Sequence, residues 1–389
     1  MPPGGATVDI MSVIATRRGL SFVASAVLFA AAVLVSVLAI PRDEDVDSGS
    51  YRSMAYGGQV CRPYAGRVLH PALVRCAVKT GVAPETAFAA VNAASAVAFY
   101  VLLLALMPPM RPAPKAFVLL ISPLWWVWGG NIYIQDMFAA ALAAAMFMAV
   151  FLAYDRGGSG LRESACGLLS VGALLFLMQV TRESSAVFAL SLAVLAWRRK
   201  ARRLAAVSVA AMAAGMAVVS WSSGGAQPNT NELGGVAYLV CKAVANGVRN
   251  FTGIVPWNDG YAMHLACYYP DPPAWKCSLP AFLQWGNVHE IGIYAFQPET
   301  IARTLAIWLL YFPGAVALWF MAPRIGRRMP YMSAFGFARM PLHVQLACVS
   351  GGIFWLLAPF SGPSLMRLVG YGWPLFWIAL PHMRRTDLS

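Results

Sequence analysis

The chain has 389 residues, of which 59% are hydrophobic and only 12% are charged. Soluble domains carry about twice that charged fraction, so the composition excludes a soluble globular protein and fits a membrane protein. A net charge of +13 would suit nucleic-acid binding, but the basic residues lie at the ends of apolar segments rather than in one patch, which excludes a nucleic-acid partner.

Apolar segments long enough to cross a bilayer recur along the chain. A span takes about 20 residues, and somewhat fewer where the protein thins the membrane. The first segment follows Arg17 and Arg18, is too long for a signal-peptide core and lacks an A-x-A cleavage site, so we interpret it as an uncleaved span. We predict about ten spans, at residues 20–40, 87–107, 116–130, 137–154, 164–180, 184–197, 204–221, 304–321, 342–360 and 368–380.

These spans are predicted to form one transmembrane domain over residues 1–389, an all-α integral membrane fold. Residues 1–19 form a cytoplasmic tail, and two outer loops are long, at residues 41–86 and 222–303. Within the first loop, Pro71–Lys79 places apolar residues at helical spacing, which predicts a short helix lying in the membrane interface.

The distribution of charge tests this topology independently. With a cytoplasmic N-terminus, 17 of the 29 basic residues and only four of the 16 acidic residues face inward, so the inner side carries the whole net charge of +13. An excess of Lys and Arg on cytoplasmic loops is the positive-inside pattern. We therefore predict a multi-pass protein of the bacterial inner (plasma) membrane with both termini in the cytoplasm.

Four acidic residues crowd together just beyond the first span: Asp43, Glu44, Asp45 and Asp47. One interpretation is a solvated loop whose charge avoids the inner side. The other is a carboxylate at the membrane surface, where a lipid-linked phosphosugar would present its reactive carbon and a general base could act on an acceptor hydroxyl.

Two basic side chains follow in the same loop. Arg67 and His70 are three residues apart and share a face if the segment is helical. They could bind lipid headgroups or belong to a functional site, and the sequence leaves both interpretations open.

Further charges stand where predicted spans meet the outer surface. Arg182 either extends to the surface or, with Glu183, lies deeper as a functional pair. Asp136 precedes a span, where we prefer the interpretation of a helix N-cap. Arg367 begins the last span and either clamps a phosphate or extends to the surface.

The seven cysteines include no C-x-x-C motif, so the sequence shows no zinc or thioredoxin-type site. Cys267 and Cys277 lie in the second outer loop and bracket a proline-rich turn. Because the outer compartment is oxidising, we predict a disulfide between them. Cys61 and Cys76 are a second candidate pair, whose separation depends on the interfacial helix.

With its outer acids in place, the opening of the chain resembles the GT-C superfamily of polyprenyl-linked-sugar glycosyltransferases, such as the protein O-mannosyltransferases and the aminoarabinose transferases of lipid A. Those proteins follow a first span with an acid-bearing outer loop. A common form has an Asp four residues before a Tyr, then a short amphipathic segment and a Pro-rich stretch. Asp47 and Tyr51 match that form, and Arg67 and His70-Pro71 follow. Elsewhere the resemblance is architectural.

The resemblance implies an inverting glycosyltransferase that moves a sugar from a polyprenyl-phosphate donor to a lipid, glycan or protein acceptor on the periplasmic face. An Asp of the first loop would deprotonate the acceptor hydroxyl, with Asp47 as the first candidate and Asp45, Asp43 and Glu44 as its competitors. The departing lipid phosphate would be bound by Arg67, His70, Arg182 and Arg367. The acceptor side would be shaped by Tyr51, Asp136, Glu183, Asp259, His264, His289 and Glu290.

Two other classes of function stay open. A transporter or lipid flippase would use the same intramembrane charges as a pathway, and an O-antigen-type polymerase also relies on outward-facing arginines. Some members of the GT-C superfamily use a divalent cation such as Mg²⁺ or Mn²⁺, but no ligand set in this sequence requires a metal or another cofactor.

Overall fold

The part of the chain that the computed structural model describes is all-helical. It comprises residues 46–58, 60, 64–107, 133, 135–156, 164–226, 243, 244, 247, 337, 338, 340–361 and 370–379. Three helices in this part are long and apolar enough to cross a membrane, namely α5 (Pro84–Leu106), α8 with its continuation (Asp136–Asp155) and α11 (Arg202–Ser222). Their length and composition are consistent with a membrane protein.

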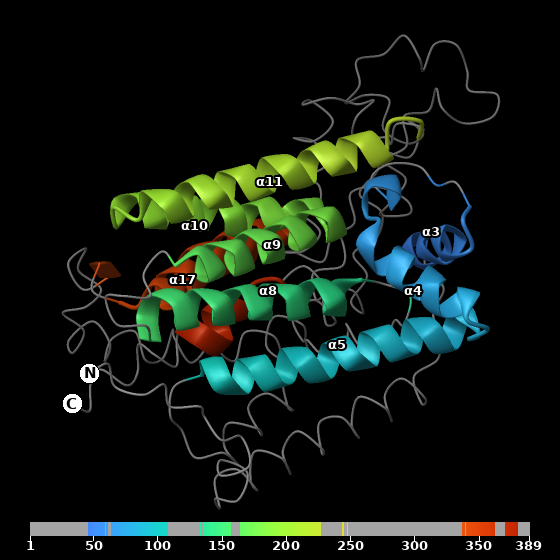
Figure 1. The fold of residues 1–389 in the computed structure, drawn as a ribbon, viewed down its shortest axis with the longest axis horizontal. Coiled ribbons are helices and arrows are strands. Elements are labelled where there is room, and N and C mark those ends of the chain that lie inside the picture. Colours follow the sequence, from blue (N-terminus) through green and yellow to red (C-terminus); the bar gives the residue numbers. More distant parts are fainter. Residues whose placement is uncertain are drawn as a thin grey trace, which may run out of the picture.

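The long helices lie side by side with their axes nearly aligned, as Figure 1 shows. Helix α8 (Asp136–Val150) packs between α5 and α9 (Ala165–Thr181), and α11 packs against α9. Further helices of the bundle are α10 (Ala186–Arg198), α17 (Leu342–Ser361) and the short π-helical turns η2 (Phe151–Arg156) and η7 (Leu375–Ala379). The two short helices α3 (Val46–Ala55) and α4 (Leu69–Lys79) contact each other at one end of the bundle.

Small residues explain how closely the central helices pack. Helix α8 reads DMFAAALAAAMFMAV, and most of its alanines are buried. Membrane helices gain little from the hydrophobic effect against one another, so they associate through close backbone approach at small residues. Gly351 on α17 likewise allows close backbone approach, because a Cβ there would lie 2.5 Å from the backbone nitrogen of Leu375.

Described helices coincide with six of the predicted spans, at residues 87–107, 137–154, 164–180, 184–197, 204–221 and 342–360. The short helix predicted over Pro71–Lys79 is confirmed as α4. The predicted spans at residues 20–40, 116–130 and 304–321 lie outside the described residues, as does most of the second long loop. The predicted span at residues 368–380 is described over residues 370–379 only, which include the π-helical turn η7.

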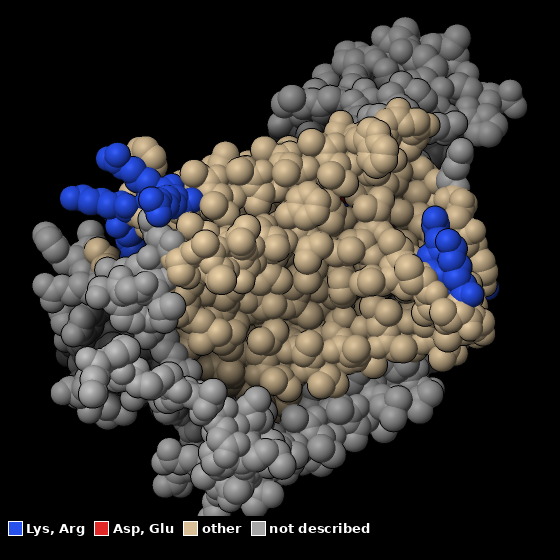
Figure 2. All heavy atoms as spheres, in the orientation of Figure 1, with Lys and Arg blue, Asp and Glu red and all other residues tan. Residues whose placement is uncertain are grey.

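Charged side chains mark the two ends of the bundle. Exposed basic residues gather where α10 ends and α11 begins, and a smaller group lies at the opposite end beside α3 and α4, as Figure 2 shows. The broad face between them shows no charged side chain in this view. Lys200 takes a left-handed backbone conformation, with φ of 62°, which lets the chain turn directly from α10 into α11.

Residues predicted to lie on the inner side meet at the end where α10 joins α11. The Asp155 carboxylate accepts hydrogen bonds from the backbone nitrogens of Leu342 and His343, at 2.6 and 3.0 Å, and thereby satisfies the N-terminus of α17. Arg199 donates to the carbonyl of Met340 nearby. The polar side chains of the opposite end form the candidate site.

Candidate functional site

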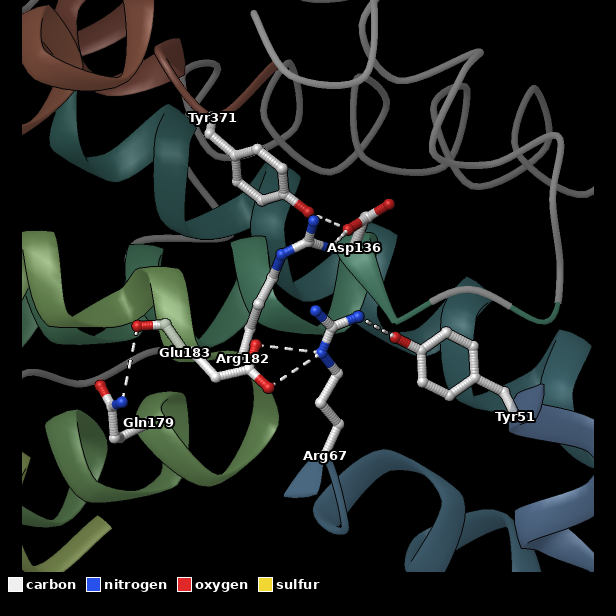
Figure 3. Close-up of polar contacts among 7 residues, drawn as sticks. All are labelled: Tyr51, Arg67, Asp136, Gln179, Arg182, Glu183 and Tyr371. Atoms are coloured by element: carbon white, nitrogen blue, oxygen red, sulfur yellow. Dashed lines mark hydrogen bonds and ion pairs between the residues drawn. The ribbon is translucent and has the colours of Figure 1, made fainter. Parts of the chain in front are cut away.

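Five segments that are far apart in sequence bring polar side chains together at the end of the bundle that holds α3 and α4, as Figure 3 shows. The members are Tyr51 on α3, Arg67 after η1 (Tyr64–Gly66), Asp136 at the start of α8, Gln179, Arg182 and Glu183 around the end of α9, and Tyr371 before η7. We call this set the arginine cluster.

Asp136 anchors the deeper half of the arginine cluster. Its carboxylate is fully buried and accepts hydrogen bonds from the Arg182 guanidinium and the Tyr371 hydroxyl. The guanidinium also stacks over the ring of Tyr371, 4.5 Å from its centroid. The Arg182 side chain is only 12% exposed, so this ion pair is largely shielded from water.

Arg67 organises the shallower half. Its Nε lies 3.2 and 3.0 Å from the two carboxylate oxygens of Glu183, and its Nη1 donates to the Tyr51 hydroxyl at 2.9 Å. Burial opposes the charge of Arg67, but Tyr51 and Glu183 outweigh it and raise its pKa. Burial also raises the pKa of Tyr51, against the lowering effects of Arg67 and Arg182, so the phenol keeps its proton at neutral pH.

The break between α9 and α10 aims Arg182 and Glu183 into the arginine cluster. Thr181 Oγ1 donates to the Leu177 carbonyl at 2.7 Å within the last turn of α9. Arg182 is then extended, with φ of −157° and ψ of 129°, and Glu183 begins the 3₁₀ turn η3 (Glu183–Ser185). The Gln179 amide donates to the Glu183 carbonyl at 3.5 Å, which ties this turn back to α9.

Helix α3 carries both Asp47 and Tyr51, one helical turn apart. The two residues therefore share a face of α3, and Tyr51 on that face bonds Arg67. Gly57, with φ of 87°, ends the helix in the left-handed conformation that favours glycine. The side chain of Asp47 lies outside what the structure describes.

His70 is buried beside the arginine cluster. Its ring contacts those of Phe88 and Phe138, both at 5.6 Å between centroids. Burial lowers the pKa of His70 from 6.5 to about 4, against smaller raising effects of Asn92 and Asp136. The imidazole is therefore neutral at physiological pH, which makes it a poor partner for a phosphate.

The structure corrects one sequence-based preference. The residue in the N-cap position of α8 is Gln135, whose side chain makes no capping hydrogen bond, and Asp136 is the first helical residue. The Asp136 carboxylate instead accepts hydrogen bonds from Arg182 and Tyr371, so the interpretation of Asp136 as a helix N-cap is wrong. The interpretation of Arg182 as a side chain that extends to the surface is wrong for the same reason.

The remaining sequence-predicted site residues are not placed by the structure. Outside the described residues lie Asp43, Glu44, Asp45, Asp259, His264, His289, Glu290 and Arg367, together with the predicted disulfide partners Cys267 and Cys277. Cys76 is exposed and its thiol is free, so the alternative disulfide with Cys61 is not formed. Within the described ranges, no group of three or more His, Cys, Asp or Glu side chains could hold a metal ion.

Sequence reasoning missed Tyr371, Gln135 and Gln179 as members or neighbours of the arginine cluster. Gln179 offered a signal, because it is a polar residue near the end of an otherwise apolar span. Tyr371 offered less, since a tyrosine near a membrane surface is ordinarily explained by the aromatic belt.

No protein-family model, curated protein or solved structure matches this chain. Function is therefore inferred from the geometry of the arginine cluster. Its two guanidinium groups are balanced by two carboxylates, and two phenols complete their hydrogen bonds. Such an arrangement holds arginines in fixed positions, ready to exchange a carboxylate for the oxygens of a bound phosphate.

Proposed function

We propose that the chain is an inverting membrane glycosyltransferase of the GT-C type, which transfers a sugar from a polyprenyl-phosphate donor at the outer face of the bacterial inner membrane. The observation that carries the proposal is the convergence of Arg67 and Arg182 at one end of a membrane helix bundle. Both guanidinium groups are largely buried, and buried charged groups are costly and cluster at functional sites.

The two arginines suit the phosphate of the donor. Glu183 is 37% exposed and its side chain can move into water, which frees the Arg67 guanidinium for phosphate oxygens. Arg182 is fixed more deeply by Asp136 and Tyr371 and supplies a second positive charge to the leaving group. Both positions were predicted from the sequence as phosphate ligands.

Asp47 acts as the general base in this proposal. Its carboxylate takes the proton of the acceptor hydroxyl, whose oxygen forms a new bond to the anomeric carbon on the face opposite the leaving group. The bond from that carbon to the phosphate oxygen breaks, and its electrons leave with the polyprenyl phosphate. The phosphodiester monoanion becomes a phosphomonoester dianion, so the charge given up by Asp47 appears on the leaving group, beside the arginines.

The other predicted residues keep narrower roles. Tyr51 orients Arg67 through its hydroxyl, and Asp136 and Glu183 position the arginines rather than the acceptor. His70 is not one of the proposed phosphate ligands, because its side chain is buried and neutral. The second outer loop is still predicted to shape the acceptor side, and Arg367 is still predicted to bind the phosphate.

A transfer assay on single-residue variants tests the proposal. Purified protein is given a short-chain polyprenyl phosphate carrying a labelled sugar, and Asp47→Asn is expected to lower the transfer rate by about 10² to 10⁴, the usual contribution of a positioned base. Asp45→Asn is expected to be milder and Asp43→Asn nearly silent. Donor binding should persist in all three variants, because the phosphate contacts are intact.

Three results would overturn the proposal in different ways. Full turnover by Asp47→Asn, together with loss of turnover in Asp43→Asn or Glu44→Gln, would move the base to another acid of the same loop. Silence of all four single changes in a working assay would remove the first loop from the chemistry. Movement of intact donor across the membrane without transfer would assign the chain to the flippases.

A further inference from the structure

Two fully buried polar side chains beside the arginine cluster have atoms without a hydrogen bond of good geometry among the residues that the structure describes. They are His70 on α4, at both ring nitrogens, and Gln135 before α8, at both amide atoms. The Asn92 side chain lies near enough to His70 for a weak hydrogen bond that raises its pKa slightly, but neither ring nitrogen has a partner with good hydrogen-bond geometry among the described residues. Buried polar atoms of this kind are uncommon in folded proteins, and a functional role is one of the explanations for them.

Aromatic contacts place the two side chains in one neighbourhood. The ring of His70 contacts Phe138, which lies three residues after Gln135 in the first turn of α8. Phe88 of α5 contacts both His70, at 5.6 Å, and Tyr133, at 5.3 Å, and Tyr133 lies two residues before Gln135. Asp136, which holds Arg182, also acts on His70 through its charge.

The chemistry of this neighbourhood differs from that of the arginine cluster. An amide and a neutral imidazole each offer a donor and an acceptor but no charge. Aromatic rings with a few convergent polar groups are the usual lining of a site for a neutral polar molecule. Hydroxyl groups fit such a lining, since each can donate and accept, whereas a phosphate would be left without a positive partner.

We propose that His70 and Gln135 form an uncharged subsite for the hydroxyl groups of the transferred sugar. The subsite adjoins the arginine cluster, as the connection between sugar and phosphate in the donor requires. Arg67 stands three residues before His70 and pairs with the Glu183 carboxylate, which is 37% exposed. The inference rests on the proposed glycosyl transfer and adds to it the residues that distinguish sugar from bare lipid phosphate.

Apolar replacements of similar size separate sugar recognition from phosphate binding. We choose Gln135→Met and His70→Leu, and measure dissociation constants for short-chain polyprenyl phosphates carrying glucose, mannose, galactose or arabinose, and for the bare lipid phosphate. Both variants are expected to weaken the tightest sugar-bearing donor by about tenfold or more, as when a buried hydrogen bond is lost. The affinity for the bare lipid phosphate should stay within about twofold of wild type.

The chain offers a matched control in Gln345 on α17, near the opposite end of the bundle. It is also buried, but its amide donates to the carbonyl of Phe337. Gln345→Met should leave both affinities unchanged and lower the melting temperature, because it leaves that carbonyl without its partner. Gln135→Met should keep or raise the melting temperature, because it removes two unpaired polar atoms.

The other outcomes of these binding and transfer measurements distinguish failure of the subsite from failure of the proposed function. If wild type transfers sugar but Gln135→Met and His70→Leu bind the sugar-bearing donor as wild type does, the subsite is wrong and the proposed function stands. Equal weakening of sugar-bearing and bare lipid phosphate would also overturn the subsite. If wild type neither binds nor uses any of the four donors, the proposed function fails and the subsite fails with it.

Discussion

At the scale of single residues, the arginine cluster depends on a buried ion pair. Asp136 is fully buried and Arg182 is 12% exposed, so each charge relies on the other for the interactions that water would otherwise supply. Removing one member of such a pair leaves an uncompensated buried charge, which typically costs about 3–5 kcal/mol, more than the pair itself contributes. This asymmetry gives a direct test of the geometry.

Asp136→Asn and Arg182→Gln are each expected to lower the free energy of unfolding in detergent by about 3–5 kcal/mol. The double variant should recover part of this loss, because it leaves neither charge alone. A double-mutant cycle from denaturant or thermal unfolding measures the coupling between the two residues. Additivity within about 0.5 kcal/mol would show that they do not interact.

The more exposed pair between Arg52 and Glu85 serves as the control. Its nitrogen-to-oxygen distance is 3.4 Å and its side chains are 39% and 30% exposed. Exposed pairs contribute about 0–1 kcal/mol, so Glu85→Gln should change stability little. The contrast between the two pairs separates burial from the mere presence of opposite charges.

At the scale of helices and turns, close packing of α17 against η7 positions Tyr371. Gly351 allows this contact, because a Cβ there would lie 2.5 Å from the backbone nitrogen of Leu375 and 3.1 Å from its Cα. Leu375 follows Tyr371 by four residues, so a shift of this segment would move the hydroxyl that bonds Asp136.

Gly351→Ala is expected to cost about 1–3 kcal/mol of stability, as overpacking typically does, and to lower transfer by displacing Tyr371. The neighbouring residue supplies the control, since a Cβ at Gly352 would meet nothing within 4 Å. Gly352→Ala should be neutral or slightly stabilising, because alanine favours the helix. Melting temperatures of the two purified variants check the prediction, and equal values would show that the contact at Gly351 is not tight.

The sequence predicts the helices of this structure much better than it predicts the contacts between their side chains. The helices were predictable because each apolar segment carries its own signal in length and composition. The pairs of the arginine cluster were not, since Arg182 and Asp136 are 46 residues apart, Arg67 and Glu183 are 116 apart, and Tyr371 and Asp136 are 235 apart. Such contacts depend on how the helices pack, which one sequence does not encode locally.

At the scale of the whole molecule, the two ends of the bundle differ in chemistry. One end holds the arginine cluster, and the other holds the turn between α10 and α11, whose exposed side chains include Arg198, Lys200 and Arg202. Between the ends, α11 has 21 residues and so measures about 31 Å, close to the hydrocarbon thickness of about 30 Å. We therefore expect the two ends to lie on opposite sides of a bilayer.

The charge pattern predicts which side is which. The basic turn should face the cytoplasm, because excess Lys and Arg are retained there during insertion. Reporter fusions at Lys200, Gly158 and Ser389 are accordingly expected to report the cytoplasm, and fusions at Ser50 and Asn258 the periplasm. Ser50 lies on α3 and Lys200 in the basic turn at the other end of the bundle, so we expect these two fusions to give opposite results. A periplasmic signal from Ser389 would overturn the predicted number of spans, and a cytoplasmic signal from Ser50 would place the arginine cluster on the wrong side for a periplasmic acceptor.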